Sequence, residues 1–193
     1  NRMDLSKYNY LKSGRNPWQD PYWYRTEVVL PKSYKGKKVW LTLNGINYRA
    51  DVWVNGRQVA DKKDIVGMFR RFKLDITEYA RAGANNCIAI KIYQVDHPGV
   101  PTPGTQLKVF GSVRGHSYDI FKDETLKISG GWDCAPVVRD RNMGIYQKVI
   151  VEATDEVLIE NPFVITTLPK STTMPMKVDT GLAKVNIKLE VRN

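Results

Sequence analysis

The side chains that most often bind metal ions or act as nucleophiles are few in this chain and lie far apart. The two cysteines are Cys87 and Cys134, and the two histidines are His97 and His116. The cysteines do not have the Cys-x-x-Cys spacing of a zinc site, and no cysteine stands in a cluster with a histidine. We therefore expect no metal site, while the sequence gives no support for a Cys87–Cys134 disulfide and leaves open whether the two cysteines pair. The sequence predicts a small buried thiol at Cys87 and two loop histidines without a chemical role.

The chain is strongly basic. Its formal net charge is +10, from 30 lysines and arginines against 20 aspartates and glutamates. Such a surplus can indicate a nucleic-acid partner. However, no phosphate-binding glycine loop and no recognition helix accompany it, and the densest lysines (32–38) lie in a predicted loop. No apolar run reaches the roughly 18 residues that a membrane span needs. We expect a solvated basic surface, with no nucleic-acid partner and no membrane partner.

Short strands with a period of two residues predict the fold class. Leu41 and Leu43 alternate with Thr42, which indicates a strand with one buried and one outward face. Asn55-Gly56 tolerates positive φ at both central turn positions, so it predicts a tight hairpin into residues 57–59. The predicted strands are 25–30, 39–43, 51–54, 72–76, 87–95 and 147–152, with at most two helical turns at 77–83. This pattern predicts an all-β protein, an antiparallel β-sandwich of the jelly-roll kind.

A second unit is predicted after residue 153. Residues 1–153 form the first β-sandwich in this interpretation, and residues 154–193 begin another unit with strands at 157–159, 163–167 and 184–192. In the last of these, Val185, Ile187, Leu189 and Val191 alternate with polar residues. That alternation predicts a strand with one buried face.

Four segments occur in an order that is typical of one protein family. They read PYWYR at 21–25, LTLNGINYRADVWVNG at 41–56, FRRFKLDIT at 69–77, and GWDCAP at 131–136, which leads through DRNMGIY at 140–146. Together they resemble the N-terminal, sugar-binding jelly-roll domain of glycoside hydrolase family 2, the family of β-galactosidases, β-glucuronidases, β-mannosidases and exo-β-glucosaminidases. The GWD segment is more similar to the β-mannosidase branch, and DRNMGI to the exo-β-glucosaminidase branch. The choice between these branches stays open.

The resemblance implies that the catalytic residues lie elsewhere. In this family, an immunoglobulin-like sandwich follows the first domain, and a (β/α)-barrel then carries two catalytic glutamates, of which the acid/base follows an asparagine. This chain has no Asn-Glu dipeptide and no strand–helix alternation that could form a barrel. Residues 154–193 would be the first strands of an incomplete immunoglobulin-like domain, which needs about 100 residues. We expect no catalytic residue, no cofactor, and downstream domains as partners.

The resemblance also implies which residues reach the substrate. Asp133 would accept hydrogen bonds from sugar hydroxyls, and Trp132 would offer an apolar face to the sugar ring. Arg139 and Asp140 are further candidates for substrate binding. The alternative is that Trp132 packs in the core and Asp133 is only a turn residue. The chain departs from the family's pattern at Cys134, where an aromatic residue is usual, and at Tyr146, where tryptophan is common.

The predicted function is therefore a non-catalytic carbohydrate-binding or scaffold domain of a family 2 exo-β-glycosidase, which acts on a β-linked glycoside. The alternative is a stand-alone carbohydrate-binding module or lectin-like jelly roll, since a fold does not determine a function. Trp23 and Trp53 are expected to pack in the core rather than to form a sugar-binding platform. If the parent protein degrades polysaccharide, we expect it to be periplasmic or secreted rather than cytoplasmic.

Overall fold

The computed structural model describes residues 20–97, 123–126, 142–168 and 182–192. The chain divides into two compact units, residues 1–153 and 154–193. In the described residues, all regular structure is β-strand except one 3-10 turn, Lys32–Tyr34, and the registered strand pairs are antiparallel. The predicted all-β, antiparallel fold is confirmed. No helix in these ranges is long and apolar enough to cross a bilayer.

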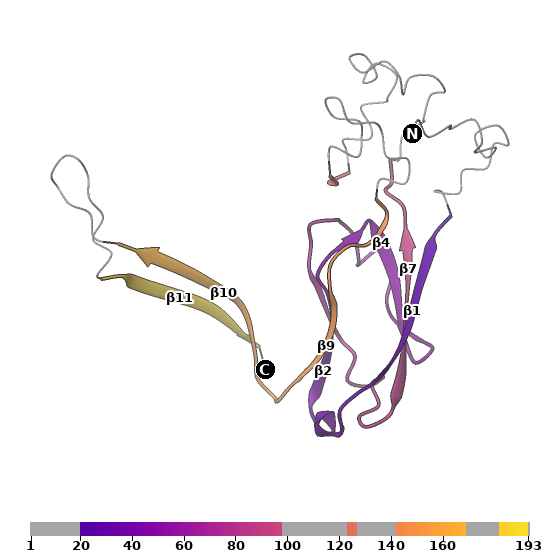
Figure 1. The fold of residues 1–193 in the computed structure, drawn as a ribbon, viewed down its shortest axis with the longest axis horizontal. Helices are drawn as coiled ribbons and strands as arrows, with labels where there is room; N and C mark the ends of the chain where they lie inside the picture. Colours follow the sequence, from indigo (N-terminus) through magenta and orange to yellow (C-terminus); the bar gives the residue numbers. More distant parts are fainter. Residues whose placement is uncertain (1–19, 98–122, 127–141, 169–181, 193) are drawn as a thin grey trace, which may run out of the picture. The chain divides into compact units, whose positions relative to one another are not determined.

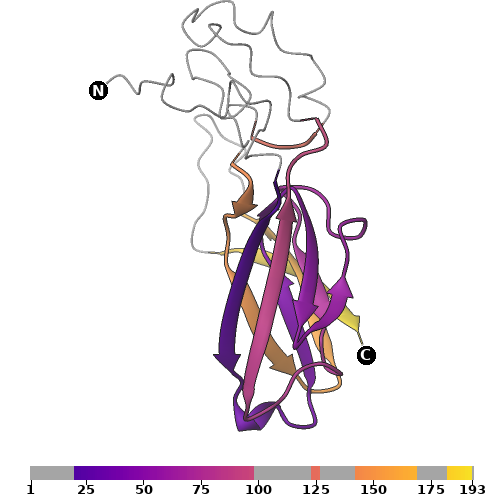
Figure 2. The ribbon, with the colours of Figure 1, turned by 90° about the vertical axis from the view of Figure 1, so that its right-hand side faces the viewer.

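The first unit is built from two sheets that lie against each other (Figure 1). A four-stranded sheet has the order β1 (Tyr22–Val29), β7 (Asn85–Tyr93), β4 (Arg49–Val54) and β5 (Arg57–Ala60). A three-stranded sheet has the order β6 (Phe72–Asp75), β2 (Lys38–Leu43) and β9 (Val149–Thr154). A short ladder joins β3 (Ile46–Asn47) to β8 (Gly144–Ile145). Figure 2 places the four-stranded sheet in front of the other layer.

The core lies between the two sheets and follows the predicted alternation on β4 and β7. Ile88, Ile90 and Ile92 are buried, whereas the residues between them are half-buried and point to the other face. Across the core, the fully buried Leu41 and Leu43 come from β2. The alternating isoleucines and leucines therefore hold the two layers together, as expected for a sandwich.

The predicted outward face of β2 is wrong, because that face is also covered. Trp40 and Thr42 are 6% and 7% exposed. The Lys73 side chain of β6 lies over the Trp40 ring, with 5.6 Å from Nζ to the ring centroid, and its Nζ pairs with a Glu152 carboxylate oxygen of β9 at 2.8 Å. Because β2 is the central strand, side chains from both neighbouring strands meet above it.

The Asn55-Gly56 hairpin is confirmed. It joins β4 to β5, with φ of 50° at Asn55 and 81° at Gly56. The residues before it, from β2 to β4, do not form a hairpin of their own. Strand β2 lies in the three-stranded sheet and β4 in the four-stranded sheet, so the residues between them cross from one layer to the other.

The expected core position of Trp23 is wrong. Trp23 is 58% exposed, and Trp53 is half-buried. Cross-strand pairing places Trp23 opposite Lys91 and Trp53 opposite Ala89, on the face that points away from the core. The two rings contact each other, with centroids 5.0 Å apart. The register of β1 directs Tyr22 and Tyr24 toward the core side and Trp23 outward.

The second unit contains one two-stranded ladder, β10 (Leu158–Thr167) with β11 (Lys184–Arg192). The two predicted strands 157–159 and 163–167 are one strand, interrupted by a register shift between Glu160 and Phe163. The predicted strand 184–192 is confirmed, but its apolar side is not buried. One face of the ladder carries six apolar residues that are all exposed: Ile159, Val164, Val185, Ile187, Leu189 and Val191.

Candidate functional site

The four predicted substrate-binding residues, Trp132, Asp133, Arg139 and Asp140, lie outside the described residues. Cys134 and His116 also lie outside them, while Cys87 is a free, half-buried thiol. The structure therefore describes the residues on either side of segment 127–141. In the described ranges, no group of three or more histidine, cysteine, aspartate or glutamate side chains could hold a metal ion.

Before segment 127–141, hydrogen bonds of Asp123 hold residues 123–126 against the chain that follows β7. Asp123 is only 3% exposed. One carboxylate oxygen accepts the His97 backbone N–H at 2.7 Å, and the other lies 3.1 Å from His97 Nδ1. His97 was expected to have no role, but it provides the partner that this buried carboxylate needs.

After segment 127–141, a hydrogen bond and a short strand pairing hold residues 142–145 against the sandwich. Asn47, which is fully buried, donates from Nδ2 to the Asn142 carbonyl at 3.1 Å. Gly144 then pairs with Asn47 in the β3–β8 ladder. A Cβ at Gly144 would lie 2.6 Å from the Tyr24 hydroxyl, and its φ is 148°. The backbone here therefore approaches Tyr24 more closely than any residue other than glycine allows.

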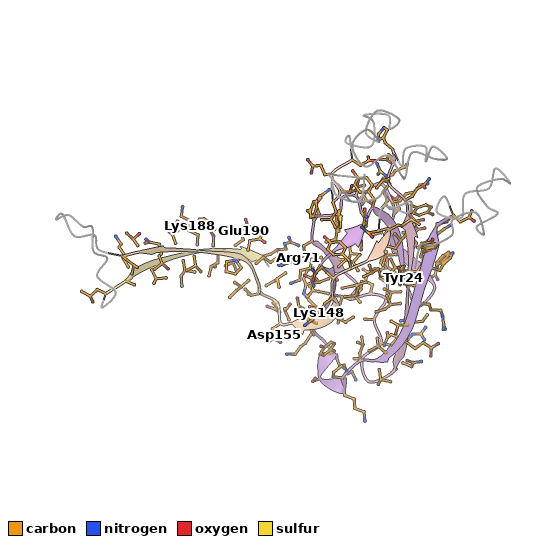
Figure 3. The ribbon with its side chains drawn as sticks, turned by 45° about the horizontal axis from the view of Figure 1, so that its top comes forward. Tyr24, Arg71, Lys148, Asp155, Lys188 and Glu190 are labelled. Carbon is orange, nitrogen blue, oxygen red and sulfur yellow. The ribbon has the colours of Figure 1, made fainter. Side chains whose placement is uncertain are left out.

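Directly after β8, three segments converge on a groove of about 500 Å³, which we call the aromatic groove. Its lining residues are Asn44, Phe69, Arg71, Tyr146, Gln147 and Lys148. They come from the end of β2, from the residues before β6, and from the link between β8 and β9. Figure 3 labels Arg71 and Lys148 on one side of the sandwich, away from Tyr24.

Hydrogen bonds fix the walls of the aromatic groove. Asn44 donates from Nδ2 to the Lys148 carbonyl at 2.9 Å. The Tyr146 backbone N–H donates to the Gly45 carbonyl at 3.2 Å, and the Tyr146 hydroxyl donates to the Met68 carbonyl. Burial raises the pKa of the Tyr146 phenol, so this hydroxyl stays protonated and remains a donor at neutral pH.

The lining of the aromatic groove suits binding rather than catalysis. Two aromatic rings can cover an apolar ligand face, two amides can exchange hydrogen bonds with hydroxyls, and two cations can donate hydrogen bonds to anionic or polar oxygens. Among the described residues, no aspartate, glutamate or histidine lines the groove. Sequence reasoning had singled out only Tyr146, because the other residues become neighbours only through the fold.

Comparisons with known proteins agree with this architecture. Residues 8–147 match the family model described as glycosyl hydrolase 2 galactose-binding domain-like. The chain is 34% identical over 129 residues to a mannosylglycoprotein endo-beta-mannosidase of Lilium longiflorum, covering 66% of this chain and 12% of that protein. It is 29% identical over 176 residues to an exo-beta-D-glucosaminidase of Amycolatopsis orientalis, covering 90% of this chain and 13% of that protein.

A solved structure shows the same fold. The crystal structure of the exo-chitosanase of Amycolatopsis orientalis is similar with a TM-score of 0.58 and 24% identity, covering 98% of this chain and 20% of that one. The chain thus spans about an eighth to a fifth of the proteins it resembles. Since the family match covers most of the 193 residues, the chain belongs to the glycosyl hydrolase 2 galactose-binding domain-like family.

Proposed function

We propose that this chain is the non-catalytic N-terminal domain of a family 2 exo-β-glycosidase and contributes to the pocket that binds the sugar of a β-linked glycoside. The observation that carries this proposal is the aromatic groove, whose described lining offers aromatic, amide and cationic groups suited to sugar binding. The printed names of its relatives, an endo-β-mannosidase and exo-β-glucosaminidases, favour carbohydrate as the ligand.

Within this proposal, Asp133 and Trp132 contact the sugar, and Arg139 and Asp140 support them. These residues belong to a segment whose two flanks, at Asp123 and Asn142, are hydrogen-bonded to the sandwich. The second flank leads within four residues to Tyr146 in the aromatic groove. This continuity supports a shared role for the segment and the groove in holding the substrate.

The test is hydrolysis by the full-length parent protein of aryl β-mannoside, β-glucosaminide, β-galactoside and β-glucuronide. One of these substrates is expected to be turned over. Asp133→Asn removes a charge-assisted hydrogen bond to the sugar, so its kcat/KM for that substrate should fall about tenfold. Asp64→Asn, at an exposed carboxylate of a surface turn, is the matched control and should change nothing.

Two results would count against parts of this proposal. Equal turnover by Asp133→Asn and the parent, with unchanged folding, would leave the domain as a scaffold without a substrate contact. Tight binding of the same sugars by the 193-residue chain alone would favour the alternative, a stand-alone carbohydrate-binding module.

We also propose that downstream residues of an immunoglobulin-like domain cover the apolar face of β10 and β11. Because six apolar side chains are exposed on that face, the 193-residue chain should bind a hydrophobic dye and self-associate. Replacing Val185, Ile187 and Leu189 together by threonine should remove most of the dye fluorescence. Threonine at Asn186 and Lys188, on the opposite face, should not. Extension of the chain through the next domain should also abolish dye binding, and continued binding would contradict the proposed cover.

A further inference from the structure

The outer face of the four-stranded sheet carries a group of aromatic and lysine side chains that the core does not use. Trp23 of β1 lies opposite Lys91 of β7, and Tyr93 of β7 lies opposite Arg49 of β4. Trp53 of β4 shares this face. With Lys62, from the loop after β5, these residues form what we call the aromatic–lysine face: Trp23, Trp53, Lys62, Lys91 and Tyr93. The sheet that bears it lies in front in Figure 2.

The rings and ammonium groups of this face alternate. Trp23 and Trp53 contact each other with centroids 5.0 Å apart and planes tilted by 34°. The Lys91 ammonium lies 5.4 Å from the Trp23 centroid and 5.1 Å from the Tyr93 centroid. The Lys62 ammonium lies 4.8 Å from the centroid of Tyr93. Both ammonium groups are therefore held by aromatic faces.

Neither ammonium is neutralised by a carboxylate of the described residues. Asp51, the cross-strand neighbour of Lys91, instead accepts hydrogen bonds from the Tyr93 hydroxyl at 2.6 Å and from the Lys62 backbone N–H at 2.8 Å. Burial and the bond to Asp51 raise the pKa of Tyr93 to about 12, so the phenol stays a neutral donor. Elsewhere on this face, Arg25 pairs with Glu27. Lys62 and Lys91 thus remain available to an external anion.

A groove of about 340 Å³ continues the aromatic–lysine face at the end of β7. Its lining residues are Arg49, Lys62, Lys63, Tyr93, Gln94, Val95 and Asp96. Its single carboxylate, Asp96, is held by Arg49, which leaves the lysines as excess positive charge. The Gln94 Oε1 atom behind this lining is buried and has no hydrogen-bond partner among the described residues. The volume lies at the lower end of the roughly 300–1,000 Å³ of small-ligand pockets.

We propose that the aromatic–lysine face binds an acidic polysaccharide, one that carries carboxylate or sulfate groups. Sugar rings stack on Trp23 and Trp53, while Lys62 and Lys91 take the anionic groups. A sugar unit at the end of the chain occupies the groove beside Tyr93. The face would hold the parent enzyme on a charged polymer, which is a task that the aromatic groove does not perform.

The chemistry of the face decides between classes of ligand. A neutral glycan would use the tryptophans but would gain nothing from two unpaired ammonium groups. Single-stranded nucleic acid also combines stacking with negative charge. We favour a glycan because the proposed function already assigns carbohydrate to this chain, and this choice rests on that proposal. The test therefore includes both alternatives as ligands.

The experiment measures binding of the 193-residue chain by titration calorimetry and affinity electrophoresis. The probes are polygalacturonate, chondroitin sulfate, neutral galactomannan and a single-stranded DNA oligonucleotide. An acidic polysaccharide should bind, and binding should weaken as ionic strength rises. Lys62→Gln with Lys91→Gln should weaken it about tenfold, and Trp23→Ala should do the same, since Trp23 is exposed and not part of the core.

Lys35→Gln with Lys188→Gln is the matched control, because it removes the same charge from exposed positions elsewhere. This control should bind as the parent chain does. Equal weakening by both lysine pairs would reduce the effect to net charge and overturn the proposal. Equal binding of DNA, or binding of galactomannan that ignores the lysines, would also overturn it. Because hydrolysis plays no part in this assay, its failure leaves the Asp133 test of the proposed function unaffected.

Discussion

Asn86→Ala is expected to lower the free energy of unfolding by about 3–4 kcal/mol. Asn86 is 2% exposed, and both the nitrogen and the oxygen of its side-chain amide make two hydrogen bonds. Its Nδ2 donates to the Arg81 and Ala84 carbonyls, both at 2.9 Å. Its Oδ1 accepts from the Arg81 backbone N–H and from Asn55 Nδ2, both at 2.8 Å. Alanine would leave several buried polar groups without partners, and each such group costs about 1–3 kcal/mol.

The loss should extend to the β4–β5 hairpin through Asn55. That residue holds a positive φ while its Nδ2 donates to the Tyr79 carbonyl at 2.7 Å and its Oδ1 accepts the Cys87 N–H at 2.9 Å. The neighbouring change Asn85→Ala is the control. Asn85 is exposed and its side chain donates to the exposed Glu27, so we expect a loss below about 0.5 kcal/mol. Urea unfolding monitored by tryptophan fluorescence gives the free energy of unfolding of both variants. Equal losses in Asn86→Ala and Asn85→Ala would contradict a stabilising role of the Asn86–Asn55 hydrogen bonds.

Gly45→Ala is expected to destabilise the first unit by about 2–3 kcal/mol and to distort the aromatic groove. A Cβ at Gly45 would lie 2.6 Å from the Tyr146 ring and 2.8 Å from Gln147 Cγ. The ring cannot easily move away, because its hydroxyl is bonded to the Met68 carbonyl. The new methyl group must therefore displace either the backbone or the ring that lines the groove.

A double-mutant cycle tests this cause. If the clash with Tyr146 dominates, Gly45→Ala should cost at least about 1 kcal/mol less in a Tyr146→Ala background than in the parent chain. Thermal and urea unfolding of the four proteins provide the coupling energy. Additive effects would mean that the cost does not arise at the Tyr146 ring but in the backbone of Gly45 or at Gln147. In the parent enzyme, the same Gly45→Ala change should also raise KM if the groove contacts the substrate.

Local patterns predicted the strands well. The hairpin at Asn55-Gly56 depends only on two residues that tolerate positive φ, and it formed as expected. The alternation along β7 and the bounds of β11 also followed from the period of two residues. The family resemblance predicted the all-β domain, and the family match over residues 8–147 confirms it. The roles of Trp132, Asp133, Arg139 and Asp140 remain predictions, because these residues lie outside the described part.

What local patterns could not predict depends on pairing between distant segments. The residues of β2 do alternate between two faces, but the outer face is buried as well. Strands β6 and β9 flank β2, and the ion pair between Lys73 of β6 and Glu152 of β9 lies over that face. Trp23 reads as a core residue in sequence, yet the β1 register turns it outward. A shift by one residue would reverse its side, and nothing within the strand itself fixes that register.

The sequence by itself determined the strand pattern, the β4–β5 turn and the family of this protein, since these depend on near neighbours or on ordered motifs. Only the tertiary structure decided that β2 and β4 belong to different layers and that the aromatic groove exists. The groove brings Asn44 together with Lys148, which lies 104 positions away in the chain. Asn44 directly follows β2 and Lys148 directly precedes β9, and these strands are neighbours in the three-stranded sheet. Such contacts arise when strands far apart in the chain pair, an arrangement that hydrophobic burial across the whole domain selects and that no short window of residues encodes.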